Sequence, residues 1–99
     1  MSQNIATVSS VSGSATVVDL FTAIGLGATS GSDALARTIH NDSTATLYVK
    51  YGATATTSDF TVKIPADGYY EVPAPVYDGL ITGIWSSATG SARLTQVTA

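Results

Sequence analysis

Apolar side chains recur at every second position in several short stretches of this chain, and this spacing limits its fold more than any other feature. The clearest example is Arg37–Gly52, RTIHNDSTATLYVKYG, where a strand pattern, a polar turn and a second strand pattern follow one another. In the second strand pattern Leu47, Val49 and Tyr51 share one face, and the residues between them share the other. Successive side chains of a β-strand point to opposite faces of a sheet, so this alternation predicts half-buried strands.

Strand patterns of the same kind extend over most of the sequence and predict the fold class. Turn signals separate them at intervals of about eight to twelve residues, which is typical of a β-sandwich or a small barrel. We therefore expect residues 15–99 to form an all-β fold, a single antiparallel β-sandwich or small barrel of about seven short strands. The one helical candidate is a single turn at Ser32–Leu35, after a glycine-containing loop over residues 21–32. The predicted strands are Ala15–Leu20, Arg37–His40, Ala45–Tyr51, Phe60–Ile64, Tyr69–Val72, Leu80–Ser86 and Ser91–Thr98.

Turn chemistry marks two of the connections. Asn41–Thr44 predicts a hairpin connection, because Asn and Asp tolerate left-handed backbone angles. Pro65–Gly68 predicts a second hairpin, in which proline presets φ at the first turn position and Gly68 takes the left-handed angle. Pro73 and Pro75 then bracket a passage at a sheet edge or between two sheets, because proline cannot donate to a central ladder.

The N-terminal segment, residues 1–14, is rich in Ser, Thr, Ala and Val but shows no clear periodicity. A segment of this kind is mobile on its own, which makes a frayed tail one interpretation. Its β-branched residues also suit the addition of a strand to the edge of a neighbouring sheet. We expect an extended N-terminal arm over residues 1–14, with Ile5, Val8 and Val11 as candidate partner-binding residues.

Charge is scarce in this chain. Charged residues make up 11% of the sequence, against about a quarter in typical domains, and the net charge is −3. The four basic residues lie in separate segments, so we expect neither direct nucleic-acid binding nor a polybasic membrane contact. There is no cysteine, so stability is expected from packing or from assembly. The N-terminus lacks a signal-peptide pattern and no apolar run is long enough to span a bilayer, which predicts a soluble protein made in a cytoplasm.

Residues that carry chemistry are few and dispersed. His40 is the only histidine, and the carboxylates fall mostly in turns, where Asp is a structural residue. Calcium bound by loop carboxylates is the metal alternative that the sequence leaves open. The chain has no GxSxG motif, and Gly25, Gly27 and Gly31 lack both the spacing and the following helix of a dinucleotide site. We therefore expect no enzyme, with no catalytic residues, no cofactor and no metal.

Aromatic side chains gather in the C-terminal two thirds of the chain. Tyr69 and Tyr70 are adjacent, so they should point to opposite faces of a strand and at least one of them outward. Exposed Tyr and Trp suit a protein interface or stacking against sugars, whereas packing in the core and at its rim is the simpler interpretation. The candidate partner-binding residues of this set are Tyr48, Tyr70, Tyr77 and Trp85.

Three stretches carry a resemblance to a known class of proteins. They are R-x-I-x-N-x-S-x-x-x-L-Y-V-x-Y-G at Arg37–Gly52, F-x-V-x-I-P-x-x-G-Y-Y-E-V-P at Phe60–Pro73 and Y-D-G-L-I-T-G-I-W at Tyr77–Trp85. Together they resemble small structural proteins encoded in tailed-bacteriophage genomes, over about two thirds of the chain. The resemblance implies a β-sandwich component of the virion without catalytic residues, such as a head decoration or cement protein, a fibre component or a tail accessory.

The resemblance and the composition together give the functional expectation. We expect a capsid decoration or cement protein, made in the host cytoplasm and located in the virion, that binds across adjacent capsomers and stabilises the head. Its expected partners are the major capsid protein or other virion proteins and further copies of the chain, with a trimer as one arrangement. The alternatives are a receptor- or glycan-binding module on a fibre or tail tip, and a subunit of a tail or connector ring.

Overall fold

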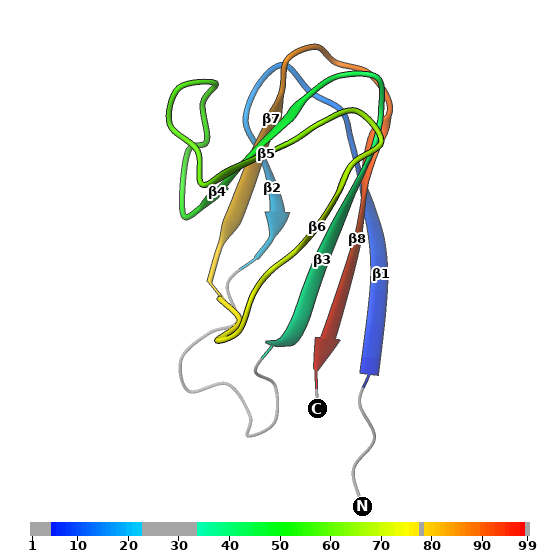
Figure 1. Ribbon diagram of the computed structural model, residues 1–99, viewed down its shortest axis with the longest axis vertical. Helices are drawn as coiled ribbons and strands as arrows, with labels where there is room; N and C mark the ends of the chain where they lie inside the picture. Colours follow the sequence, from blue (N-terminus) through cyan, green and yellow to red (C-terminus); the bar gives the residue numbers. More distant parts are fainter. Residues whose placement is uncertain (1–4, 23–33, 78, 99) are drawn as a thin grey trace, which may run out of the picture.

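The computed structural model describes residues 5–22, 34–77 and 79–98, which form eight β-strands in two stacked sheets (Figure 1). The first sheet has the strand order β1-β8-β3-β6 and the second sheet has the order β2-β7-β4-β5. All neighbouring strands are antiparallel and neither sheet closes on itself, so the predicted all-β sandwich is confirmed and the barrel alternative is excluded. The strands are β1 (Ile5–Ser12), β2 (Val18–Phe21), β3 (Ala34–Asp42), β4 (Leu47–Tyr51), β5 (Val62–Ile64), β6 (Tyr69–Glu71), β7 (Ile81–Trp85) and β8 (Ser91–Thr98).

Most connections cross from one sheet to the other. Among the described strands, only β4 and β5 follow one another within the same sheet. The two predicted hairpins are therefore wrong, because Asn41–Thr44 leads from β3 to β4 and Pro65–Gly68 leads from β5 to β6, each time across the sandwich. Pro65–Gly68 does form a turn, closed by a 2.8 Å hydrogen bond from the Gly68 N–H to the Pro65 carbonyl, but the left-handed φ of 60° belongs to Asp67.

The N-terminal segment differs most from its sequence-based expectation. Over Ile5–Ser12 the expected arm is strand β1, which pairs along its whole length with β8, from Ile5 opposite Thr98 to Ser12 opposite Ser91. This strand brings the number of strands to eight instead of about seven. The expected helical turn at residues 32–35 is also wrong where it is described, because residues 34 and 35 begin β3. Most of the expected loop, residues 23–32, lies outside the described residues.

The core fills the space between the two sheets. Ile39 and Leu94 of the first sheet meet Leu47, Ile81 and Trp85 of the second, and each of these side chains is almost completely buried. The alternation predicted for β4 is confirmed for Leu47 and Val49, which are buried, whereas Tyr51, expected on the same face, is half-buried against the core. In the part of the chain that is described, no helix is long and apolar enough to cross a membrane.

Candidate functional site

Arg37 is fully buried and ties separate segments of the chain together. Its Nε donates to Gln96 Oε1 at 2.7 Å, and its Nη1 donates to the carbonyl oxygens of Tyr77 and Gly79 at 2.9 and 2.7 Å. Its Nη2 donates to the carbonyl oxygen of Thr22 at 3.0 Å. These acceptors lie just after β2, in β8 and between β6 and β7. A planar guanidinium with five N–H donors can bond to acceptors on several of its sides at once. The contacts of Arg37 thus serve the fold.

Asn41 is the second buried polar hub. Its Nδ2 donates to the carbonyl oxygens of Ala45, Ile64 and Pro65 at 2.8 to 3.0 Å, and its Oδ1 accepts a 3.1 Å bond from Trp85 Nε1. These bonds join β3 to the β5–β6 turn and to β7 across the sandwich. The sequence predicted a turn residue at this position, but β3 continues to Asp42 and Asn41 points into the core.

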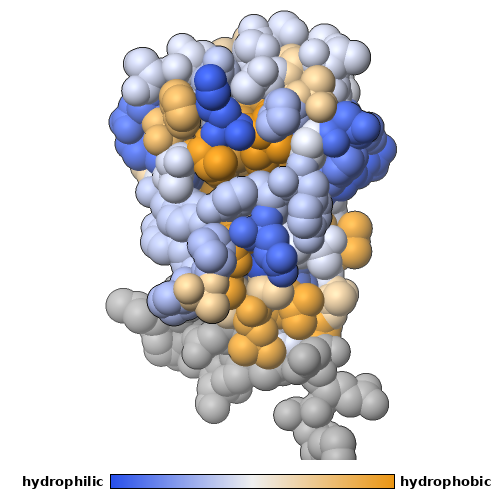
Figure 2. Space-filling model, viewed as in Figure 1, coloured by the Kyte–Doolittle hydropathy of each residue, from blue (hydrophilic) through white to orange (hydrophobic). Residues whose placement is uncertain are grey.

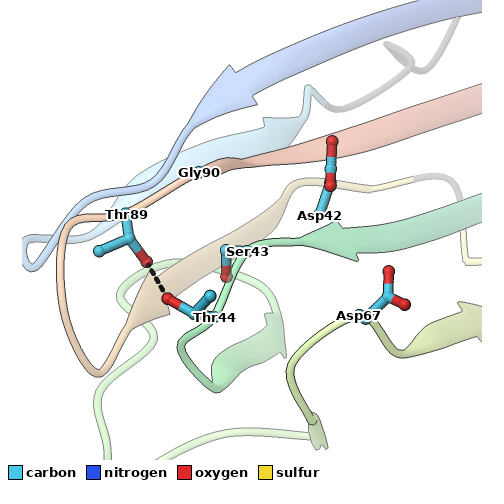
Figure 3. Close-up of a pocket in the computed structure, with 6 residues that line it drawn as sticks. All are labelled: Asp42, Ser43, Thr44, Asp67, Thr89 and Gly90. Atoms are coloured by element: carbon cyan, nitrogen blue, oxygen red, sulfur yellow. Dashed lines mark hydrogen bonds between the residues drawn. The ribbon is translucent and has the colours of Figure 1, made fainter.

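An open hollow lies at the end of the sandwich where three connections meet (Figure 3). The connections are those between β3 and β4, between β5 and β6, and between β7 and β8. The Oγ1 atoms of Thr44 and Thr89 lie 3.4 Å apart on one side of it, and Asp67 approaches from the other side (Figure 3). The hollow has a volume of about 480 Å³ and is lined by Asp42, Ser43, Thr44, Asp67, Thr89 and Gly90.

Potential metal ligands come together beside this hollow. One ligand atom each from His40, Asp42 and Asp67 lies within 4.8 Å of the others. Both carboxylates already have partners: Asp67 Oδ1 lies 3.2 Å from His40 Nε2, and Asp42 Oδ2 accepts a 3.1 Å bond from Arg93 Nε. Calcium takes about six to eight oxygen ligands, and a neighbouring arginine opposes a cation, so the arrangement is better described as an exposed His40–Asp67 contact beside the exposed ion pair of Asp42 and Arg93.

The tyrosines expected at an interface pack largely against one another. The hydroxyl oxygens of Tyr51 and Tyr70 lie 2.8 Å apart, and the Tyr51 ring stacks on Tyr77 with ring centroids 4.9 Å apart. Burial and the hydrogen bond to Tyr70 raise the pKa of the Tyr51 hydroxyl above its ordinary range. Tyr48 is half-buried against Phe60, with ring centroids 5.1 Å apart. These rings therefore contribute to the packing of the sandwich.

The other candidate partner-binding residues divide into buried and exposed ones. Trp85 is only 1% exposed and forms part of the core, and Val11 is half-buried against that core. Ile5 and Val8, by contrast, are 58% and 71% exposed on β1. Of the candidate partner-binding residues, those on β1 are thus the most available for surface contacts. Seven of the eight residues of β1 are exposed.

Three of the four sheet edges are short or interrupted. β5 and β6 have three residues each, β2 has four, and the register of β2 shifts between Asp19 and Phe21. Each of these edges also carries a charged residue, namely Asp19 in β2, Lys63 in β5 and Glu71 in β6, and Pro73 follows β6 closely. Short strands, bulges, charges and proline are the means by which proteins prevent their sheet edges from pairing with other chains.

The edge formed by β1 has none of these features. Its sequence, IATVSSVS, is eight residues long, contains neither charge nor proline, and pairs with β8 without a register shift. No strand of the described part of the chain pairs with its other side. Figure 2 shows that strongly hydrophilic groups occupy only a few places on the face drawn, as the low charge content requires. The β1 edge is therefore the candidate interaction surface of this protein.

Sequence reasoning missed one exposed aromatic residue. Tyr69 is 62% exposed and lies opposite His40 in the β3–β6 register, whereas Tyr70 lies opposite the buried Ile39 and faces inward. The expectation that the two adjacent tyrosines point to opposite faces is thus confirmed. Which of them faces outward depends on the register of β6 against β3, for which the sequence offers no local signal.

The comparisons with known proteins returned no family model, no curated protein and no solved structure that matches this chain.

Proposed function

We propose that this chain is a non-enzymatic structural protein of a virus particle: a capsid decoration or cement protein that binds across adjacent capsomers and stabilises the head. Its partners in this role are the major capsid protein or other virion proteins, and further copies of itself. The observation that carries the proposal is the unprotected edge of β1, which is regular and uncharged and which, within the described part of the chain, is unpaired along one side. An edge of this kind is suited to adding a strand from another chain.

The polar residues of the interior support a structural role. Among the described residues the buried polar side chains are Arg37, Asn41 and Thr82. Thr82 Oγ1 donates to the Gly52 carbonyl at 2.8 Å and accepts a 3.1 Å bond from the Ala55 N–H, and the other two form the hubs described above. All three side chains are thus engaged in joining strands and loops, whereas catalytic groups converge on a pocket.

The chain's low charge and its resemblance to virion proteins also favour this role. Charged residues make up only 11% of the sequence, so electrostatic repulsion opposes association of this chain with other proteins only weakly. A small contact is sufficient for attachment when many copies bind one particle, because linked contacts strengthen one another. Three stretches resemble tailed-phage structural proteins, and they contain the buried Arg37, Asn41 and Thr82 and much of the core. The resemblance therefore concerns residues that build the sandwich.

Restoring the chain to particles that were assembled without it tests the proposal. The purified wild-type chain should bind these heads to saturation and raise the temperature at which they release their genome. Val8→Lys places a charge on the open edge, at a side chain that is exposed and outside the core. It should weaken the affinity for the heads by about tenfold or more, because the same loss of binding free energy occurs at every copy. Thr57→Lys adds the same charge on the exposed β4–β5 loop and should bind as the wild type does. Heads that neither bind the wild-type chain nor gain stability would contradict the proposal.

A second candidate function is receptor or glycan binding at a fibre or tail tip. It is favoured by the exposed ring of Tyr69, which starts β6 two residues after Asp67 at the rim of the hollow. An exposed aromatic ring beside carboxylates and hydroxyls offers both stacking and hydrogen bonds to a sugar. Glycan-array binding by the wild-type chain that is lost in Tyr69→Ala, but kept in Tyr48→Phe, would favour this alternative over head decoration.

A further inference from the structure

We propose that the open edge of β1 pairs with β1 of a second copy of this chain, antiparallel and across a two-fold axis. Each copy contributes its four-stranded β1-β8-β3-β6 sheet. The two sheets then form one continuous sheet, with the two β1 strands side by side at its centre. This inference rests on the association role proposed for β1 and names the partner.

The hydrogen-bond pattern shows which groups of β1 are available. The N–H of Gly13 donates to the carbonyl oxygen of Gly90 at 2.8 Å, one step beyond the pairing of Ser12 with Ser91. In an antiparallel pair, residues bonded to the neighbouring strand alternate with residues whose N–H and C=O point the other way. The backbone groups that point toward the open edge are therefore those of Ala6, Val8, Ser10 and Ser12.

In one register of two antiparallel β1 strands, apolar side chains lie opposite apolar side chains. When the two-fold axis passes beside Val8, Val8 of one copy lies opposite Val8 of the other, and Ile5 lies opposite Val11. Apolar side chains then meet on both faces of the joined sheet, and the two Val8 residues exchange backbone hydrogen bonds. A register centred on Ser10 instead opposes Val8 to Ser12 and loses these apolar pairs.

The occupant is a second copy because the strand is complementary to itself and lacks charges that would select a different partner. A two-fold contact uses the same surface on both copies, so it closes and leaves no free β1 edge for fibre growth. It produces a dimer, whereas a trimer would need a head-to-tail contact between different surfaces. A single strand pair is smaller than the roughly 1,200 Å² of a stable interface, so the dimer should dissociate on dilution.

Single-cysteine cross-linking tests both the partner and the register, because the chain has no cysteine of its own. In the proposed dimer the two Val8 Cα atoms lie about 5.5 Å apart, within the range of about 4.4–6.8 Å that a disulfide spans. Val8→Cys should therefore form a disulfide-linked dimer under mild oxidation. Ser12→Cys is the matched control on the same face of the same strand, and its two copies would lie about 27 Å apart.

We expect the Val8→Cys dimer to form at least about tenfold faster than the Ser12→Cys dimer, which reflects the effective concentration in a specific pair. Sedimentation of the wild-type chain should show a monomer–dimer equilibrium that Val8→Lys abolishes and Thr57→Lys preserves. Equal cross-linking at the two positions, or a wild-type chain that is monomeric at every concentration, overturns the inference. A monomeric chain that still fills its sites on particles rejects self-pairing alone, and a dimer that binds no particle rejects the virion role alone.

Discussion

The polar hub at Asn41 permits a quantitative prediction. Asn41→Ala removes the acceptor of the Trp85 indole N–H and the donor to three carbonyl oxygens; these bonds are buried except the one to Pro65, which is partly buried. A buried donor left without a partner costs about 1–3 kcal/mol, and each lost hydrogen bond adds about 0.5–1.5 kcal/mol. Some of the carbonyl groups keep other partners, so we expect a loss of about 4 kcal/mol in the free energy of unfolding, out of about 5–15 kcal/mol for a typical domain.

Urea denaturation gives the measurement, because Trp85 is the only tryptophan and its buried ring reports on the core. With a slope of about 2 kcal/mol per molar urea, the loss corresponds to a midpoint lower by about 2 M. The isosteric variant Asn41→Asp is the sharper test, since it keeps the volume of the side chain but turns a donor into an oxygen that faces carbonyl oxygens. It should be at least as destabilised at neutral pH.

A double-mutant cycle isolates the bond between Asn41 and the indole. In a Trp85→Phe background, followed by circular dichroism, Asn41→Ala should cost about 1–2 kcal/mol less than in the wild type, because no buried N–H is left without an acceptor. Additive effects of the two substitutions, or an Asn41→Asp variant as stable as the wild type, would refute the assignment of Asn41 as a structural hub.

Three further perturbations probe other parts of the structure. Arg37→Lys should lower the free energy of unfolding by about 3 kcal/mol in urea denaturation, because an ammonium group cannot reach acceptors on several sides; stability equal to wild type would contradict this role. Gly83→Ala should cost about 1–3 kcal/mol in the same assay, since the new Cβ would lie 2.8 Å from Leu20 Cδ1, and a neutral effect would show that the core has room. Because the raised pKa of Tyr51 lets the unfolded chain lose its phenolic proton first, stability should fall as pH rises above about 10, and Tyr51→Phe should flatten this fall; an equally steep fall in Tyr51→Phe would contradict this assignment.

The local structure of this protein follows from its sequence because strand alternation is a local signal. Leu47 and Val49 were expected on one face of a strand, and both are fully buried in β4. The turn at Pro65–Gly68 was also expected, and Gly68 is required there because a Cβ would lie 2.9 Å from Pro65. Only the residue with the left-handed angle, Asp67, differs from the prediction.

The pairing of strands does not follow from local signals. Ile5 pairs with Thr98 across almost the whole chain, and neither residue carries a mark of that partner. The same holds for Asn41, which looks like a turn residue in sequence and becomes a buried hub only because β3 crosses to β4 at this point. Alternation states which residues share a face, whereas the choice of neighbouring strands depends on long-range packing.

The candidate site was predictable in part for the same reason. The β-branched residues of the N-terminal segment predicted strand addition, and the segment forms β1, on which Ile5 and Val8 are exposed. Binding of a partner by these residues stays a prediction. Only the structure shows that one side of this strand pairs with β8, and that no described strand pairs with its other side. The expected aromatic contacts at Tyr70 and Trp85 depended on strand registers that the sequence does not specify.

The number of copies of this chain per purified virion, measured by quantitative mass spectrometry against the major capsid protein, tests the proposed function most directly. Head decoration predicts many copies, in a simple whole-number ratio to the capsid protein, because each capsomer site repeats over the shell. A number that fits only a single ring or a few fibres would contradict head decoration and assign the chain to the tail or connector. Its absence from the purified virion would reject a structural role in the particle.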